Sequence, residues 1–409
     1  MPATGSETAT PSHALRVEIH RDIPELRDLW RNFQAVARGG PHDTWEWADA
    51  WARTAGKASA PLIAIGRDAS GQILFLLPLT IRKRAGCDIL EWLGAEQGNY
   101  TSGLFHPAAW TEQTLPRGKD LLARVLGALP RIDAVHLADQ PLAIGNTLNP
   151  FARLPGIPAA SEGHAFPLNA AWHKHFKESF SSHHRNNIRR SERQLGELGA
   201  VRFDVVEHGP VRSQVMDGII TEKRIWFADR GLPDCFANAA VREFFRLLVQ
   251  IPDTDAGPAI RIFTLSVGDE IVATNLGLIY QNKFYGLIAS TTAGPMRRHS
   301  PGRLLFLRLV EYLANEGIET LDCGAGEDLE KLRWCTQRRE RWNAIVPVTA
   351  KGFVYAAALK SMLFIKRQIK QSPRLWNQVN RLRKWKSRFG ASRPSAAADK
   401  RHSAVRVKA

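Results

Sequence analysis

The sequence predicts an α/β (α+β) protein of two tandem lobes with mixed central sheets, followed by a basic helical tail. With 409 residues, the chain exceeds the roughly 250–300 residues at which a single hydrophobic core stops growing. Helical and strand patterns alternate along residues 15–350. Positive charge is concentrated after them, because residues 351–409 hold sixteen Lys and Arg and one acidic residue, whereas residues 1–350 hold 40 and 39. The body is therefore nearly neutral, which argues against nucleic acid as its partner.

The first lobe is expected over residues 15–165, where apolar residues at helical spacing alternate with short apolar runs. These patterns predict, in order, helices at 23–37 and 44–54, strands at 61–68, 71–84 and 88–94, a helix at 119–129 and a strand at 133–139.

The second lobe is expected over residues 166–350. Its patterns predict a basic helix at 170–199, a strand at 201–207, helices at 211–231 and 238–251, strands at 259–269, 270–281 and 283–292, a helix at 304–317, a strand at 318–324, a short helix at 328–335 and a last strand at 341–349. The three central strands follow one another through short turns at Gly268-Asp269 and Gln281-Asn282, which is typical of an antiparallel meander.

The two ends of the chain differ from this body. Residues 1–14 are rich in Ser, Thr and Ala and are expected to be disordered. In the basic tail, 351–409, residues 353–370 are apolar enough for one more helix, and the Arg- and Lys-rich stretch from residue 381 onward is expected to be frayed or disordered.

Several classes of protein are excluded or disfavoured. No stretch reaches the roughly 18 consecutive apolar residues that cross a bilayer, and the first residues do not resemble a secretory signal. We therefore expect a cytoplasmic protein. The four cysteines are widely spaced and form no CxxC pair, so we expect buried free thiols and no metal site.

The strongest local signal is the turn Arg-Arg-His-Ser-Pro-Gly-Arg at 297–303, between a predicted strand and a predicted helix. The unpaired N–H groups and the dipole of a helix that starts after Pro301 favour a phosphate group. Glycine permits close backbone approach, and arginines add charge-assisted hydrogen bonds. The expected pyrophosphate-binding residues are Arg297, Arg298, His299, Ser300, Gly302 and Arg303. The alternative is an ordinary helix start with surface arginines.

In its turn and in the order of its elements, the chain resembles the GNAT superfamily of acyltransferases. The family's donor-binding turn reads Gln/Arg-x-x-Gly-x-Gly/Ala, and Ser300 stands here where the middle glycine is expected. The sequences SPGRLL and GIETLDCGAGEDLEKLRW resemble the CelD/BcsL type within it, as do TWEWADAW, FLLPLTIRKRAG and LEWLGAEQGNY of the first lobe. The resemblance covers most of residues 15–350 and implies two tandem GNAT-like lobes.

The resemblance implies an acyl-CoA donor, acetyl-CoA above all, and direct attack of an acceptor amine or hydroxyl on the thioester. The implied acceptor is a small-molecule or lipid-linked sugar of bacterial polysaccharide synthesis. In such enzymes a backbone N–H holds the thioester carbonyl where two central strands splay apart, which is expected here near residues 276–278 and 289–291.

Three residues are candidates for catalysis. Asp322 and Glu327 stand at the end of a predicted buried strand, where ligands gather in α/β folds. Asp322 is the candidate orienting group and Glu327, or its neighbour Asp328, the candidate base, with helix capping as the alternative for the latter two. The resemblance adds Tyr100 as a contact for the acceptor or the donor carbonyl, against the alternative of a half-buried turn tyrosine.

Acceptor binding is expected from basic and aromatic residues of the second lobe. Arg185 and Arg189 stand at helical spacing and suit an anionic sugar nucleotide or lipid-linked phosphate, with a solvated basic face as the alternative. Lys331 and Trp334 lie on one short helix and either face the acceptor or serve as a solvated lysine and a core tryptophan.

Two further questions stay open at this level. The basic tail, with Trp376, Trp385 and Phe389 among its cations, suits peripheral contact with an anionic inner membrane, a nucleic-acid contact or simple solubility. The alternative functions are an aminoacyl-tRNA-dependent peptidyltransferase of the FemABX kind and a non-catalytic GNAT-like scaffold. The basic turn favours the acyl-CoA enzyme over both.

Overall fold

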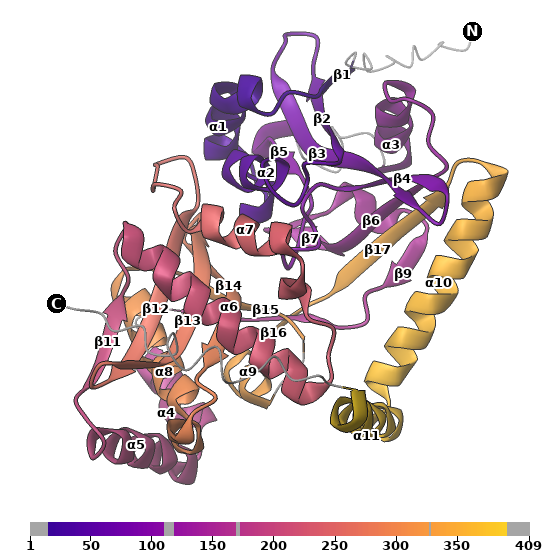
Figure 1. The fold of residues 1–409 in the computed structure, drawn as a ribbon. Coiled ribbons are helices and arrows are strands. Elements are labelled where there is room, and N and C mark those ends of the chain that lie inside the picture. The colour runs from indigo at the N-terminus through magenta and orange to yellow at the C-terminus, as the bar shows by residue number, and fades with distance from the viewer. Residues whose placement is uncertain (1–14, 110–117, 169–171, 327–328, 391–409) are drawn as a thin grey trace, which may run out of the picture.

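Two mixed sheets, each flanked by helices, form the body of the protein (Figure 1). The computed structural model describes residues 15–109, 118–168, 172–326 and 329–390. The predicted disorder of residues 1–14 and of residues 391–409 lies outside this described part. The mixed sheets in two lobes confirm the predicted α/β (α+β) class.

The first sheet has the strand order β1-β2-β3-β4-β6-β17-β9, and β5 pairs with β3. Its strands are β1 (Arg16–His20), β2 (Ala60–Arg67), β3 (Ile73–Arg84), β4 (Cys87–Trp92), β5 (Leu104–Phe105), β6 (Ala134–Pro141), β17 (Arg341–Pro347) and β9 (Gly156–Pro158). The helices of this lobe are α1 (Arg27–Val36), α2 (Trp45–Ala52) and α3 (Gly118–Gly127), and β7 (Ala143–Ile144) forms a hairpin with β8 (Thr147–Leu148). β2 and β3 carry long buried runs, as expected for strands that are covered on both faces.

The second sheet has the order β11-β12-β13-β14-β15-β10-β16. Its strands are β11 (Val201–Val205), β12 (Ala259–Val267), β13 (Glu270–Tyr280), β14 (Lys283–Thr291), β15 (Thr320–Ala325), β10 (Gly163–Pro167) and β16 (Gln337–Arg339). β12, β13 and β14 form the predicted antiparallel meander. Gln281 and Asn282 have φ values of 50° and 56° in the last turn, as a tight hairpin requires. β14 then pairs in parallel with β15.

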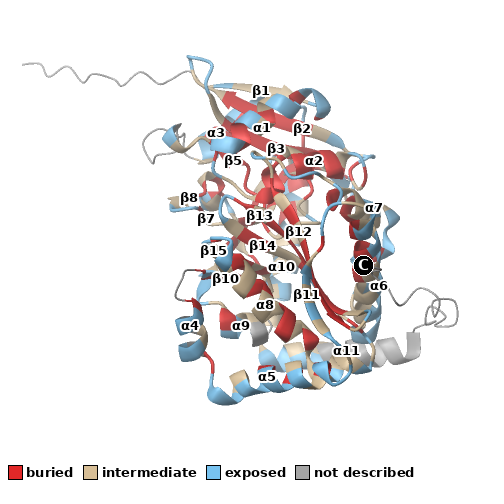
Figure 2. Cartoon of the chain, turned by 90° about the vertical axis from the view of Figure 1, so that its left-hand side faces the viewer, coloured by how far each residue is buried: buried red, intermediate tan, exposed pale blue. Residues whose placement is uncertain are grey.

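The helices of the second lobe are α4 (Trp172–Ser179), α5 (Ser182–Gly196), α6 (Pro210–Arg230), α7 (Ala239–Leu248), α8 (Pro301–Asn315) and α9 (Leu329–Trp334). The predicted single helix at 170–199 is two helices, because Ser181 leaves helical geometry and its Oγ accepts a hydrogen bond from the His184 N–H. The outer sides of α4 and α5 are exposed, whereas the central strands are buried (Figure 2).

The two lobes exchange strands. β17 was expected in the second lobe but pairs with β6 and β9 in the first sheet, which corrects the expected lobe boundary for this segment. β10, at the junction of the expected lobes, inserts between β15 and β16 of the second sheet. Each sheet therefore gains a strand from outside its own lobe. The first sheet contains β17 from the second lobe, and the second sheet contains β10 from the end of the first lobe.

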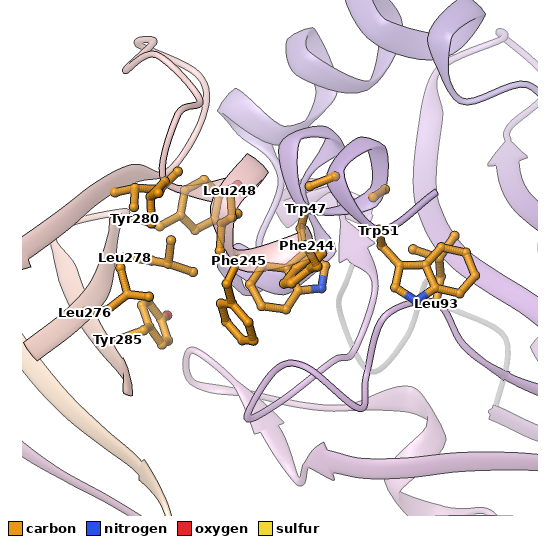
Figure 3. Close-up of a cluster of buried hydrophobic side chains, with 14 of the residues drawn as sticks. Trp47, Trp51, Leu93, Phe244, Phe245, Leu248, Leu276, Leu278, Tyr280 and Tyr285 are labelled. Atoms are coloured by element: carbon orange, nitrogen blue, oxygen red, sulfur yellow. The ribbon is translucent and has the colours of Figure 1, made fainter. Parts of the chain in front are cut away.

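One hydrophobic cluster crosses from lobe to lobe. Trp47 and Trp51 of α2 lie beside Phe244 and Phe245 of α7, and the cluster continues into β13 and β14 of the second sheet (Figure 3). The Trp47 and Phe244 rings meet edge to face with centroids 4.9 Å apart. The lobes thus share a core and form one folded body.

The basic tail continues as two helices, α10 (Ala350–Gln371) and α11 (Pro373–Gly390). α10 confirms the predicted helix and packs on β17, β6 and β9, along one flank of the molecule (Figure 1). The expectation of a frayed chain from residue 381 onward was wrong as far as Gly390, because α11 is helical to that point and packs against α10 and α6.

Candidate active site

β14 and β15 part beyond Tyr285. Their parallel register runs from Lys283–Thr320 to Tyr285–Asp322, and β14 then continues to Thr291 beside β13 alone among the described strands. β14 has a bulge at Leu287, which is left without a partner between the pairs Leu276–Ile288 and Gly277–Gly286. The opening therefore lies between β14 and β15. The expected residues 289–291 lie on its β14 side, but residues 276–278 do not border it, since they pair with both β12 and β14.

Asn99, from the first lobe, bridges the two parting strands. Its Nδ2 donates to the Gly286 carbonyl of β14 at 2.9 Å, and its Oδ1 accepts from the Ala325 N–H of β15 at 3.4 Å. Gly324 lies against the Asn99 amide and has a φ of 73°, so a side chain there would strike it. The loop that contains Asn99 thus reaches into the opening between the strands.

Tyr100 and Asp322 form a buried pair at the same place. The Tyr100 hydroxyl donates to Asp322 Oδ1 at 3.0 Å, and the Gly324 N–H donates to the same oxygen at 2.7 Å. Arg339 Nε lies 3.4 Å from Asp322 Oδ2. Burial raises the pKa of the Asp322 carboxyl, and burial together with Asp322 raises the pKa of Tyr100 far above its usual range. A neutral hydroxyl and a carboxyl of enhanced basicity therefore share one hydrogen bond.

The loop that contains Asn99 and Tyr100 is held by a carboxylate that the sequence reading missed. Asp43 accepts hydrogen bonds from the backbone N–H groups of Gly40, Ser102 and Gly103 at 2.9–3.0 Å, and from the Ser102 hydroxyl at 3.1 Å. It is buried, and burial raises the pKa of its carboxyl. Asp43 follows a proline and a histidine in a short segment without any motif, so no local pattern marks it.

The basic turn lies at the start of α8, as expected. Ser300 takes a left-handed conformation (φ 53°) and makes no side-chain cap, and Ser300, Gly302 and Arg303 are partly exposed. Two expected details differ. The His299 ring contacts Gln194 of α5 and the side chain of Arg298. A Cβ on Gly302 would lie 2.8 Å from Thr291 of β14, so this glycine serves close packing of the helix on the strand.

Four cations from α6, the basic turn and α9 lie near one another. Lys223 lies over the Trp226 ring at 4.3 Å, and its Nζ is 3.4 Å from the Ala289 carbonyl on the β14 side of the opening. Burial, with Arg230 and Lys331 nearby, lowers the pKa of Lys223. Burial and then the Arg297 charge lower the pKa of Arg230. These residues, which we call the α6 cation cluster, are Lys223, Arg230, Arg297 and Lys331. Lys223 and Arg230 were missed because their helix carries no motif.

The expected acceptor residues do not all reach this site. The Arg185 guanidinium donates to the carbonyls of Lys177 and Phe180 and so caps the end of α4. Arg189 is exposed on α5. Trp334 is buried among the rings of Phe166, Phe176, Phe180 and Phe306. Trp334 is therefore a core residue, and Arg185 caps a helix; neither side chain is placed to bind an acceptor at this site.

Lys331 does lie near the buried pair, since its Nζ donates to the Ala325 carbonyl at 2.9 Å and its charge lowers the pKa of Asp322 in opposition to burial. Glu327 and Asp328 lie outside the described residues. Cys323 and Cys335 are free thiols whose sulfurs are 3.5 Å apart, a proximity that the wide cysteine spacing had not predicted. No cluster of three metal-ligating side chains occurs in the described ranges.

A cavity of about 710 Å³ lies behind the site, between β9, β17 and the two tail helices. Five cations and two carboxylates line it: Arg153, Arg338, Arg341, Arg367, Lys370, Glu162 and Glu340. Arg341 connects the cavity to the site, because its guanidinium donates to the Ser161 carbonyl and, at 3.4 Å, to the Asn99 carbonyl. The Arg367 Nε is buried without a hydrogen-bond partner.

The chain was compared with models of protein families. Residues 182–332 match the acetyltransferase (GNAT) domain, a range that includes the meander, the basic turn, α8 and β15. A search of curated protein sequences gave no significant match.

Solved structures are similar to the chain as a whole. FemX superposes with a TM-score of 0.53 at 11% identity, over 80% of this chain and 97% of FemX. A conserved protein of unknown function from Bacteroides thetaiotaomicron gives a TM-score of 0.50 at 11% identity, over 81% and 99% of the two chains. At these identities the likeness concerns the fold. Residues 182–332 thus match the acetyltransferase (GNAT) domain, and they lie within a two-lobed fold similar to that of FemX.

Proposed function

We propose that the protein is an acyl-CoA-dependent N- or O-acyltransferase that transfers acetyl groups to a sugar or amino sugar of bacterial polysaccharide synthesis. The observation that carries the proposal is that three features come together around the opening in the middle of the second sheet. These are the parted strands β14 and β15, the basic start of α8 and the buried Tyr100–Asp322 pair. The match of residues 182–332 to an acetyltransferase domain supports the reaction class.

The donor would lie along β14 with its diphosphate at the basic turn. The partly exposed first turn of α8 offers N–H groups and the positive end of its dipole. Arg297 and Arg230 of the α6 cation cluster add charge on the same side. The outward carbonyls of Gly286 and Ala289, which now contact Asn99 and Lys223, are the backbone acceptors that an amide-bearing pantetheine arm requires. The residues present therefore fit an acyl-CoA.

The buried pair supplies a path for the proton that the reaction releases. The acceptor's nitrogen or oxygen forms a bond to the thioester carbon, the carbon–sulfur bond breaks, and coenzyme A leaves as a thiolate. In this scheme the acceptor passes its proton to the Tyr100 oxygen while Tyr100 passes its own proton to Asp322. The raised pKa of Asp322 suits this end of the relay, because it makes the carboxylate a stronger base than an exposed one.

An anionic acceptor is supported by the cavity behind the site. Its five cations outnumber its two carboxylates, and the unpartnered Arg367 Nε is a donor that a phosphate oxygen would satisfy. A sugar nucleotide or a lipid-linked sugar phosphate carries such a group. Arg341, which contacts both the cavity and the loop at Asn99, would couple acceptor binding to the reaction site.

The test separates donor binding from turnover. Isothermal titration with acetyl-CoA is expected to show saturable binding by the wild type and about tenfold weaker binding by Arg297→Ala, since one charge-assisted contact is lost. The control Arg16→Ala removes an exposed guanidinium on β1 of the first lobe and should bind as the wild type does.

Turnover is measured as thiol release from acetyl-CoA with glucosamine, glucosamine 1-phosphate and UDP-glucosamine as acceptors. Tyr100→Phe and Asp322→Asn should keep the acetyl-CoA affinity and lose about 100-fold in kcat, as expected when a proton relay is interrupted. An unchanged kcat in both variants would refute the relay. Absence of acetyl-CoA binding by the wild type, together with transfer from an aminoacyl-tRNA, would replace the proposal by the FemABX-like alternative.

A further inference from the structure

The outer face of α10 is apolar and exposed. Val354 is 70% exposed, Phe353 66%, Ile365 58% and Phe364 55%, values that are typical of polar surface residues and unusual for large hydrophobic ones. Met362 joins them on the same helix. Exposed apolar side chains gathered on one element mark an interaction surface.

These side chains form a continuous stripe. At 100° per residue, positions 353, 354, 357, 358, 361, 362, 364, 365 and 368 fall on one half of α10, and all of them are exposed. Only Ser361 and Gln368 among them are polar. From Phe353 to Ile365 the stripe is about 18 Å long, at 1.5 Å per residue.

The opposite half of α10 is fixed to the body of the protein. Gly352 and Ala356 are buried, and Thr349, which caps the helix, donates to Asp133 at the start of β6. Since α10 packs along β17, β6 and β9, its outer face cannot turn inward without loss of these contacts. The exposed stripe is therefore a fixed feature of the fold.

The charge around the stripe identifies its partner. α10 and α11 together hold eleven Lys and Arg and no Asp or Glu. Lys351 and Lys366 are exposed and flank the stripe along α10. A second copy of the chain would bring two such helix pairs together and place like charges against each other. Nucleic acid would use the cations but leave the apolar stripe in water. An anionic membrane surface satisfies both, since apolar side chains enter its interface and cations meet its headgroups.

We propose that α10 lies flat on an anionic membrane, with the stripe from Phe353 to Ile365 embedded in the headgroup region. The proposed contact is peripheral, with the helix parallel to the membrane surface. No helix of the described ranges combines the length and apolar character of a bilayer span. This inference concerns α10, whereas the sequence alone had pointed to Trp376, Trp385 and Phe389 further along the tail. It does not depend on the reaction that the protein catalyses.

The experiment is flotation of the purified full-length protein with vesicles of phosphatidylcholine containing about 30% phosphatidylglycerol, and with vesicles of phosphatidylcholine alone. We expect binding to the anionic vesicles, at least tenfold weaker binding to the neutral ones, and a loss of binding as salt is raised from about 0.1 to 0.5 M. The triple variant Phe353→Ser/Phe364→Ser/Ile365→Ser should lose at least tenfold in bound fraction.

The matched control is Val36→Ser/Leu198→Ser, which replaces exposed large apolar residues elsewhere and should bind as the wild type does. Circular dichroism of all variants verifies that they are folded. Equal binding by the triple variant and the wild type would overturn the proposal, as would wild-type protein that stays with the unbound fraction. A dimer in light scattering that the triple variant converts to a monomer, without vesicle binding by the wild type, would assign the stripe to a second copy instead.

Discussion

At the scale of single residues, His42 and Asp43 support the loop that contains Asn99 and Tyr100. Asp43 accepts four hydrogen bonds, three of them from Ser102 and Gly103 in that loop, and the His42 ring lies against Trp47 at 4.6 Å and against Gly98. Both side chains come from the first lobe and act on a site in the second. The position of Tyr100 relative to Asp322 thus depends on the packing of His42 and Asp43 in the first lobe.

His42 gives this support a pH dependence. Burial lowers its pKa from the ordinary 6.5 to about 4. The His42 imidazole therefore binds a proton below about pH 6.5 in the unfolded chain but only below about pH 4 in the folded protein. Because the unfolded state binds more protons between these values, the free energy of unfolding falls as the pH falls through this window. Relative to His42→Leu, the wild type should lose about 3 kcal/mol of unfolding free energy between pH 7.5 and pH 4.

Urea denaturation at four pH values measures this difference. Asp43 and Asp322 contribute in the opposite direction, because their raised pKa values make stability fall as the pH rises. Both carboxyls are present in the wild type and in the variant, so the difference between the two unfolding free energies removes their contribution. Parallel pH profiles of the two proteins would show that His42 does not titrate in this window.

At the scale of elements, α10 is held at its first turn. A Cβ on Gly352 would lie 1.7 Å from the Asp133 carbonyl, so only glycine lets the helix approach the start of β6 this closely. Gly352→Ala should lower the unfolding free energy by about 1–3 kcal/mol, as expected for overpacking, and should speed trypsin cleavage at Lys360 and Lys366.

The matched control is Gly196→Ala, at the end of α5, where an added Cβ meets no atom within 4 Å. This control should leave stability unchanged or slightly raised, because alanine favours helix. If both substitutions have the same effect, α10 is not anchored at Gly352.

The sequence predicted these elements well where the pattern is local. The meander, its turn at Gln281 and Asn282 and the helix after Pro301 follow from short-range spacing and turn chemistry. β17 was assigned to the wrong sheet because an apolar strand fits either one, and only non-local pairing decides between them. The Tyr100–Asp322 contact joins residues 222 positions apart. The end of a predicted buried strand drew attention to Asp322 and a family resemblance to Tyr100, but no spacing predicted that they meet.

At the scale of the whole molecule, the two sheets repeat one topology. β4, β6 and β17 of the first sheet correspond in order to β14, β15 and β10 of the second, and in both cases the central pair is parallel over three residues. In the first lobe the place that corresponds to the opening holds ion pairs, in which Arg82 and Arg84 bind Glu96, and a cavity of only about 110 Å³. The proposed site lies in the second lobe, and the first lobe supplies the loop with Asn99 and Tyr100 that contacts β14 and β15.

Strand exchange and the shared core predict that the lobes unfold together. Ile345 of β17 is fully buried, and its N–H donates to the Pro155 carbonyl at 2.7 Å. Ile345→Ala should lower the unfolding free energy by about 2–5 kcal/mol, and the loss should reach both lobes because the cluster around Trp47 and Phe244 couples them. Hydrogen exchange of β2 and β12 peptides across a urea series should give one shared midpoint, shifted equally by the substitution.

The matched control is Val348→Ala, because Val348 lies three residues further along the chain and is exposed. This substitution should change the free energy of unfolding by no more than about 0.5 kcal/mol. A shift confined to β2 would mean that the lobes are independent units, and the dependence of Asp322 on first-lobe packing would then lose its basis.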